Sequence, residues 1–255
     1  MKCIIKIIFP VLFLLISCSN NEEKITSLNQ LDGKRICVLN GSAGDIAARK
    51  HFPNSRFDVV QGSADAGLAV KKGKADAFIY DRSVLQNIVN QNPELTILDE
   101  KVGDVEFAAA IKKGNIALLE RINESITELR NEGKLDELRS KWLETKYTKV
   151  PEYNVVLDKS APKLRLGTAA MYEPFTFVAS GKITGLDIEL SSLIAEKLGM
   201  SLEITDMVFE ALIPALQAGK IDIAVSSFTV TEERKKAISY SEPYIKNDIS
   251  VLVRK

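Results

Sequence analysis

The sequence predicts an α/β fold with two similar lobes, because one arrangement of residues occurs twice. Residues 66–81 (AGLAVKKGKADAFIYD) and 211–226 (ALIPALQAGKIDIAVS) each contain an amphipathic helix, a glycine–lysine stop, an aspartate and an apolar strand. Each half of the chain also begins with a strand that leads into a loop of small residues. Such alternation is typical of open parallel sheets, in which ligands bind beyond the carboxyl ends of the strands. If the two lobes turn those ends toward each other, a ligand lies in the cleft between them.

The composition is that of an ordinary globular protein and excludes several functions. The 34 basic and 34 acidic side chains balance, whereas a nucleic-acid-binding protein needs an excess of positive charge. One histidine, His51, and three cysteines leave too few soft ligands for a zinc or iron–sulfur site. We therefore expect no metal and no cofactor. A chain of this length buries enough surface to fold without disulfides.

Residues 1–17 have the pattern of an export signal. Lys2 and Lys6 give the start a positive charge, and residues 7–16 form an apolar run that includes Pro10. A helix of that length rises only about 15 Å, half of a bilayer core, so the run is too short to span a membrane. It ends in the sequence Leu-Ile-Ser-Cys at residues 15–18, which resembles the bacterial lipobox.

The lipobox resemblance implies that Cys18 is lipidated and that residues 18–27 form a polar tether. The alternative is an ordinary secretory signal with a chance cysteine. We expect an extracytoplasmic protein that is anchored to the cell envelope through this lipid alone, since no second long apolar segment follows. Cys37 lies in an apolar stretch, which favours a buried strand residue over a reactive thiol.

The rest of the chain divides where the residue pattern changes. Residues 28–102 carry the first copy of the repeat, and we call them the N-terminal lobe. Residues 103–143 contain an apolar strand and two charged amphipathic helices that are separated at Gly133. Residues 144–162 have two prolines and little periodicity, which is typical of a surface linker. Residues 163–255 carry the second copy, and we call them the C-terminal lobe.

Five segments together resemble the bacterial extracellular solute-binding proteins of the polar amino-acid class, which are receptors of ABC transporters. In the C-terminal lobe they are LRLGTAAMYEPFTF, GLDIELSSLIAEKLG and FEALIPALQAGKIDIAVSSFTVTEERKKAISYSEPY. In the N-terminal lobe they are LDGKRICVLNGSAGD and GKADAFIYD. The resemblance implies a two-lobed, type II periplasmic-binding-protein-like fold, often called a Venus flytrap. Residues 163–255 match the first α/β lobe of that family, residues 28–102 the second, and residues 103–143 the segment that returns to the first.

The order of these segments differs from the order in the family. The family runs from first lobe to second lobe to return segment, whereas this chain begins with the second lobe and ends with the first. The resemblance thus implies a circular permutation in which residues 144–162 join the usual termini. We expect the chain to begin near Ser27 and stop near Lys255, beside the hinge, with one covalent crossing left near residues 103–107. Permutation is tolerable because it moves only an exposed break. The alternative is a fragment of a longer tandem array.

The chemistry of an amino-acid ligand requires two opposite charges in the site. A buried zwitterion needs a cation for its carboxylate and an anion for its ammonium, because unpaired buried charge is costly. Arg234 matches the family's carboxylate-binding arginine, and Asp81 matches the aspartate that takes the ammonium. The alternatives are that Arg234 is a solvated charge in the run 232–236 and that Asp81 caps the following helix.

The same matching implies six further ligand contacts. Two hydroxyl residues would bind the zwitterion, two residues at the start of a helix would offer backbone N–H groups, and two aromatic rings would enclose the ligand side chain. In that order they are Ser227, Thr229, Ser42, Ala43, Tyr172 and Phe209. The family often has threonine where this chain has Ala43, so only the backbone donor remains there. For the aromatic rings the alternative is plain core packing.

The identity of the amino acid stays open at this point. Ala169 occupies a position where the family's binders of basic amino acids often carry an acid, which argues weakly against arginine, lysine or histidine. Glu173 and Glu210 keep a basic ligand possible.

The leading hypothesis is a monomeric, lipid-anchored receptor that passes a polar amino acid to an ABC permease and has no enzymatic activity. One alternative is a sensory or scaffolding lipoprotein that binds a ligand without transport. A second alternative is an enzyme, since relatives with this fold dehydrate cyclohexadienyl acids. A dehydratase needs a buried acid beside the ligand, and Glu173 is the candidate.

Overall fold

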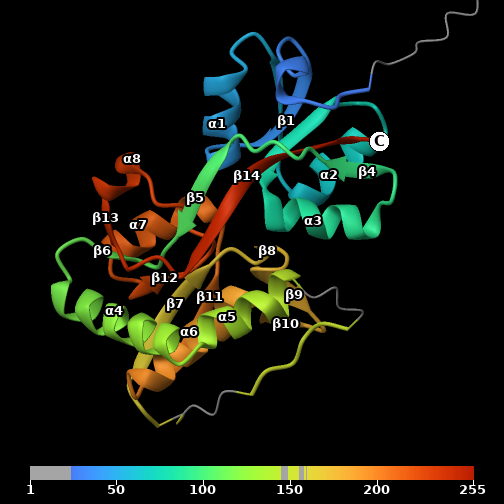
Figure 1. The fold of residues 1–255 in the computed structure, drawn as a ribbon. Helices are drawn as coiled ribbons and strands as arrows, with labels where there is room; N and C mark the ends of the chain where they lie inside the picture. Colours follow the sequence, from blue (N-terminus) through green and yellow to red (C-terminus); the bar gives the residue numbers. More distant parts are fainter. Residues whose placement is uncertain (1–23, 145–148, 155–157, 159) are drawn as a thin grey trace, which may run out of the picture.

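Two large β-sheets and one small one organise the described part of the protein (Figure 1). The computed structural model describes residues 24–144, 149–154, 158 and 160–255. The expected signal, Cys18 and most of the expected tether lie outside the described residues. Among the described residues, no helix combines the length and the apolar character that crossing a bilayer demands.

The sheet of the N-terminal lobe has the strand order β2-β1-β3-β14-β4. Its parallel strands β1 and β3 are almost wholly buried, because helices pack against the sheet and favour apolar residues on both faces. The elements from residues 28–102 are η1 (Leu28–Gln30), β1 (Arg35–Leu39), α1 (Ala43–His51), β2 (Arg56–Val60), α2 (Ser63–Lys71), β3 (Ala77–Asp81), α3 (Arg82–Gln91) and β4 (Leu95–Ile97).

The sheet of the C-terminal lobe has the order β11-β7-β12-β6-β13. A separate antiparallel sheet, β10-β9-β8, lies beside it. Their elements are β7 (Lys163–Thr168), β8 (Met171–Tyr172), β9 (Thr176–Ala179), β10 (Lys182–Thr184), α6 (Leu186–Lys197), β11 (Ser201–Asp206), η3 (Phe209–Ala211), α7 (Leu212–Gln217), β12 (Ile223–Ala224), α8 (Glu232–Lys235) and β13 (Ile238–Tyr240).

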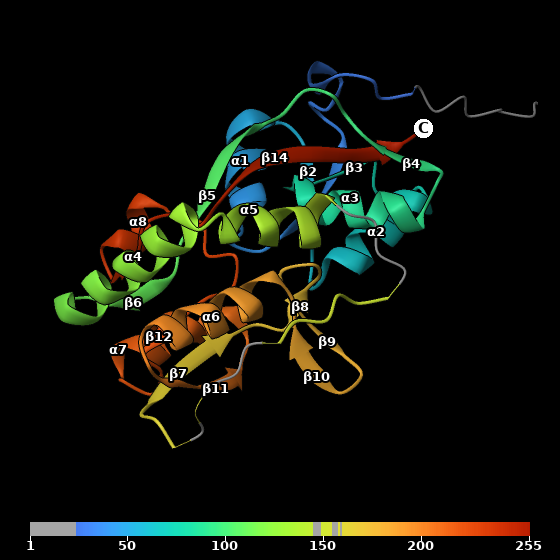
Figure 2. The same cartoon turned by 60° about the horizontal axis from the view of Figure 1, so that its bottom comes forward.

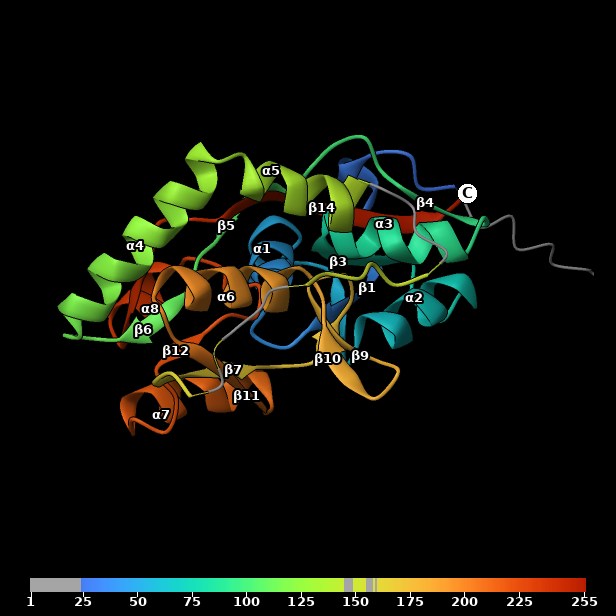
Figure 3. The ribbon, with the colours of Figure 1, turned by 90° about the horizontal axis from the view of Figure 1, so that it is seen from below.

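Residues 103–143 connect the lobes and then complete the C-terminal lobe. They form β5 (Gly103–Phe107), β6 (Ala110–Lys112), α4 (Ile116–Asn131) and α5 (Lys134–Arg139), followed by a π-helical turn, η2 (Ser140–Glu144). β6 inserts between β12 and β13, and both α4 and α5 pack against α6 (Figure 3). Of the expected linker, Tyr153 packs against Trp142, with ring centroids 6.5 Å apart.

The two sheets share one plan. In each, three parallel strands are followed by one antiparallel strand that another part of the chain supplies, and then by a fourth strand of the lobe. The supplied strand is β6 in one lobe and β14 (Ile245–Arg254) in the other. The expected two-lobed α/β fold is therefore confirmed.

The path of β14 corrects two expectations. Residues 163–255 do not form one lobe, because β14 pairs with β3 and β4 in the N-terminal lobe. The chain also crosses between the lobes twice, since β5 pairs antiparallel with the first half of β14. The physical reason is burial: Ile249, Val251 and Val253 enter the core of the N-terminal lobe. Because of this extra strand, the ends of the described chain do not lie beside the hinge. Lys24 and Lys255 line one hollow. The end marked C in Figure 2 lies at the end of β14 that is remote from β5.

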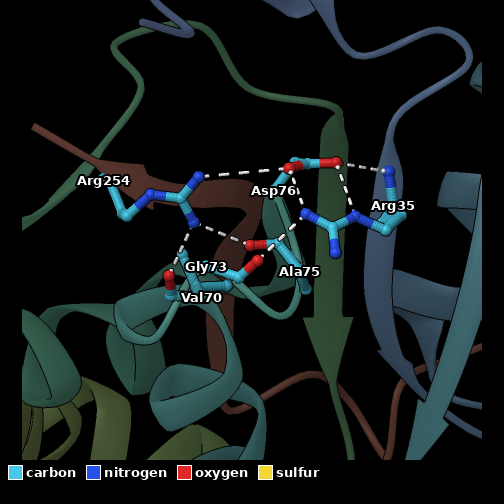
Figure 4. A network of polar contacts seen from close by, with 6 residues as sticks. All are labelled: Arg35, Val70, Gly73, Ala75, Asp76 and Arg254. Atoms are coloured by element: carbon cyan, nitrogen blue, oxygen red, sulfur yellow. Dashed lines mark hydrogen bonds and ion pairs between the residues drawn. The ribbon is translucent and has the colours of Figure 1, made fainter. Parts of the chain in front are cut away.

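The repeat predicted from the sequence has a structural cause in each lobe. Gly73 and Gly219 follow α2 and α7 with φ of 69° and 68°, a backbone conformation that favours glycine. The aspartate that follows then binds the first strand of its lobe. Asp76 accepts hydrogen bonds from the backbone and guanidinium of Arg35, and Arg254 approaches it from β14 (Figure 4). Cys37 is a buried core residue, and burial raises its pKa to about 11, so it is no reactive thiol.

Candidate ligand-binding site

A cavity of about 40 Å³ lies between the two lobes at the carboxyl ends of β1 and β3. All eight residues that the sequence nominated for ligand binding line it. The lining residues are Asn40, Ser42, Ala43, Tyr80, Asp81, Tyr172, Phe209, Glu210, Ser226, Ser227, Thr229 and Arg234. The predicted residues thus come together from both lobes, whereas the lipidation candidate Cys18 lies outside the described residues.

The N-terminal lobe supplies the start of α1 to the cavity. Ser42 caps this helix, and its hydroxyl accepts a hydrogen bond of 3.1 Å from the Asp45 backbone N–H. Helix α1 lies very close to β3 at Gly44. A Cβ atom added to Gly44 would lie only 2.4 Å from the Ile79 carbonyl oxygen. This contact holds the backbone of residues 42 and 43 at the cavity, where the first N–H groups of a helix favour an anion.

Asp81 lies at the end of β3 and is only 7% exposed. Its Oδ1 atom has no hydrogen-bond partner among the described residues, and its side chain does not cap α3. The helix-cap alternative is therefore not supported. Burial raises the pKa of the Asp81 carboxyl to about 7. A buried carboxylate without a partner is costly, so this group favours a cation in the cavity.

Arg234 reaches the cavity from α8 of the C-terminal lobe. Its guanidinium donates to the carbonyl oxygen of Thr229 at 3.2 Å and lies over the rings of Phe209 and Phe228, at 5.0 and 5.3 Å. Its neighbours Lys235 and Lys236 pair with acids of the same helical turn, whereas Arg234 has no ion-pair partner in the described part of the chain. The solvated-charge alternative therefore fits the two lysines better than Arg234.

The two predicted aromatic residues line the cavity, and each stacks on a different ring. Tyr172 stacks on Tyr80 of the other lobe, with ring centroids 6.0 Å apart and planes 15° apart. Phe209 stacks on Phe228, with centroids 4.7 Å apart. Both Tyr172 and Phe209 are half-buried, so they pack against core rings and still present surface to the cavity.

Asp187 holds the polar loop in place and was missed from the sequence. Ser227 has a φ of 48°, an uncommon backbone conformation for a residue other than glycine. The fully buried Asp187 carboxylate accepts a 2.8 Å hydrogen bond from the Ser227 backbone N–H and another from the Tyr244 hydroxyl. Burial raises the pKa of Asp187 to about 6, although these hydrogen bonds oppose the rise. Asp187 is therefore a positioning residue.

The two acids that left a basic amino acid possible as the ligand, Glu173 and Glu210, lie in different places. Glu210 lines the cavity, whereas Glu173 lines two hollows outside it. Ala169 is buried beneath the site, and its backbone N–H donates to the Ser226 hydroxyl at 3.1 Å. Sequence reasoning also missed Asn40, Tyr80 and Ser226 as lining residues. Their proximity to matched residues is the only signal that could have found them.

Comparisons with known proteins find similar sequences. Residues 164–255 match the model of the bacterial extracellular solute-binding proteins, family 3. The arginine-binding extracellular protein ArtP of Bacillus subtilis (strain 168) is 42% identical over 82 residues, which are 32% of either chain. The glutamine-binding protein GlnH of the same organism is 28% identical over 122 residues, 48% of this chain and 45% of that protein.

Among solved structures, an ancestral arginine-binding protein bound to arginine is 49% identical, with a TM-score of 0.32. The match covers 32% of this chain and 37% of that one. The chain thus spans about a third to a half of the length of the relatives named here. Residues 164–255 thus match the model of the bacterial extracellular solute-binding proteins, family 3, and parts of the chain are similar to proteins that are named for the amino acids they bind.

Proposed function

We propose that this protein is a lipid-anchored extracytoplasmic receptor that binds a polar α-amino acid between its lobes for uptake by an ABC transporter. One observation carries the proposal: Asp81 and Arg234 come from opposite lobes and line one small cavity. An α-amino acid presents an ammonium and a carboxylate a few ångströms apart. Asp81 would take the ammonium, and the planar fork of Arg234 would grip both carboxylate oxygens.

The mechanism is closure of the lobes without chemistry. A ligand that contacts both lobes binds the closed arrangement better than an open one, and it shifts the hinge equilibrium by that difference in affinity. The ribbon of β5 and β14 is the expected hinge, because it holds both covalent crossings. The hydroxyls of Ser227 and Thr229 and the α1 backbone at Ser42 and Ala43 would complete the contacts to the zwitterion.

The envelope location and the permease rest on sequence. The apolar run of residues 7–16 and the Leu-Ile-Ser-Cys ending support lipidation of Cys18. Mass spectrometry of the membrane-extracted protein would find two or more acyl chains on Cys18. The Cys18→Ser variant would be found in the soluble fraction. Detection of an unmodified Cys18 within the membrane fraction would contradict the anchor.

We also propose that the chain is a circular permutant of the family order. Two observations support this: Lys24, Ile25 and Lys255 line one hollow, and residues 144–162 join α5 and η2 to β7. The matched segment, residues 164–255, lies at the end of this chain.

A thermal-shift screen against the twenty amino acids tests the proposed function. A tight ligand raises the apparent melting temperature by mass action, by an amount equivalent to about 2.7 kcal/mol at a hundredfold excess over Kd. We expect one chemically related group of amino acids to stabilise the protein and none to stabilise Arg234→Ala to the same extent. A flat response to all twenty would overturn the proposal.

A further inference from the structure

The charges in the cavity do not balance. Three of the lining residues are charged: Asp81 and Glu210 are acids, and Arg234 is a base. The other lining residues are neutral, so the cavity carries one excess negative charge when Asp81 is ionised, the form that pairs with an ammonium. A neutral zwitterion would pair with Asp81 and Arg234 and leave Glu210 without a counterion.

Glu210 is available for a ligand. It lies in η3 next to Phe209, is exposed, and forms no ion pair or hydrogen bond within the described residues. Two other glutamates of the C-terminal lobe have partners: Glu189 binds Lys141, and Glu203 binds Lys163. The Glu210 charge also acts on the cavity wall. Burial raises the pKa of the Tyr172 hydroxyl, and this charge acts in the same direction.

We propose that the cavity binds an α-amino acid with a positively charged side chain, a guanidinium or an ammonium, and that Glu210 is the residue that selects this charge. The inference rests on the proposed function and narrows it. A ligand of net charge +1 neutralises all three charged residues, with its carboxylate on Arg234, its ammonium on Asp81 and its side chain toward Glu210. Glu210 attracts a positively charged side chain across the site, so this match favours a basic amino acid over a neutral one.

The sequence argument against a basic ligand concerned a position outside the lining of the cavity. It relied on the absence of an acid at residue 169, but Ala169 is 1% exposed and does not line the cavity. Glu210 supplies a negative charge to the same cavity from a different element, the turn that precedes α7.

Arginine and citrulline provide a direct test, because they have nearly the same shape and differ by one charge. Titration calorimetry at low salt would measure both ligands on the unmodified protein, on Glu210→Gln and on Glu196→Gln. Glu196 is an exposed glutamate of α6 outside the cavity, so Glu196→Gln removes the same charge without touching the site. Ornithine and glutamine form a second pair of similar length for an ammonium ligand.

We expect the charged member of at least one pair to bind several times tighter than the neutral member. Glu210→Gln should remove most of that preference, and Glu196→Gln should leave it unchanged. The ratio should also fall with added salt, because Glu210 is exposed and screened.

Three outcomes would overturn the inference. The first is equal or tighter binding of the neutral members, which leaves the amino-acid receptor intact and refutes only the charge selection. The second is an unchanged ratio in Glu210→Gln, which would make Glu210 a helix-terminus acid without a ligand role. The third is no binding of any amino acid, which would refute the proposed function as well.

Discussion

The Arg234 guanidinium donates a 3.3 Å hydrogen bond to the carbonyl oxygen of Gly41, and this contact joins the two lobes across the cavity. The same side chain is held in its own lobe by the Thr229 carbonyl oxygen and by two aromatic rings. Arg234 is therefore oriented before any ligand arrives. Preorganisation of this kind lowers the entropy cost of binding.

Replacement of Arg234 tests its role in gripping the ligand carboxylate. We expect Arg234→Ala to raise Kd by two to three orders of magnitude or more, roughly 3–5 kcal/mol, because it leaves a buried carboxylate unpaired. Arg234→Lys should recover only part of the loss, since an ammonium cannot form the bidentate fork. Calorimetry of both variants measures this, and near-original affinity in Arg234→Ala would remove Arg234 from the site.

Replacement of Asp81 should separate binding from stability. Asp81→Asn removes the acceptor for the ligand ammonium, so amino acids should lose far more affinity than analogues without the amino group. The same change should stabilise the empty protein at pH 8 by roughly 2–4 kcal/mol, because a buried carboxylate with a raised pKa opposes folding when ionised. Denaturant unfolding at pH 8 tests the second effect. Equal losses for both ligand types would refute the ammonium role.

The raised pKa of Asp81 also predicts how binding depends on pH. The ammonium requires the ionised carboxylate, and below about pH 7 the empty site holds a proton there. We expect Kd to rise about tenfold per pH unit as the pH falls from 7 to 5. The stability of the empty protein has the opposite dependence: the folded state binds the proton more tightly, so stability is full below about pH 4 and falls as the pH rises to 7. A flat Kd between pH 5 and 8 would contradict this assignment, and Asp81→Asn is the control that should lack the slope.

The sequence predicted what is encoded locally. The glycine stops at Gly73 and Gly219 and the aspartates that follow them mark both lobes, because helix ends and strand starts depend on nearby residues. The strand character of residues 245–254 is local too, but its place between β3 and β4 depends on pairing with residues more than 150 positions away. Asp187 was missed for a related reason: an acid in the first turn of a helix usually suits the helix dipole and gives no sign of burial.

Asp187 offers a test of how the polar loop is held. Asp187→Ala removes the acceptor for the Ser227 N–H and for the Tyr244 hydroxyl, and buried donors without partners cost about 1–3 kcal/mol each. We therefore expect lower stability and weaker ligand binding together. Asp187→Asn keeps an acceptor oxygen and should restore most of both, which separates hydrogen bonding from charge. If Asp187→Ala loses stability but retains full affinity, Asp187 does not position the site.

The proposed permutation can be reversed by rearranging the chain. Lys255 and Lys24 line one hollow, so a short flexible linker can join them, and new ends can be opened after Asn154, which leaves the packing of Tyr153 on Trp142 intact. All strand pairs are then kept, so we expect the rearranged chain to fold with a ligand affinity within about threefold of the original and a stability within about 1 kcal/mol. Opening the chain instead within α6, between Leu190 and Ser191, cuts a buried helix and should abolish folding. The control is a circular chain in which Lys255 is joined to Lys24 and residues 144–162 stay intact. If this control folds but the first rearrangement does not, the connection at residues 144–162 is essential. That result would contradict its role as a simple join between the usual termini.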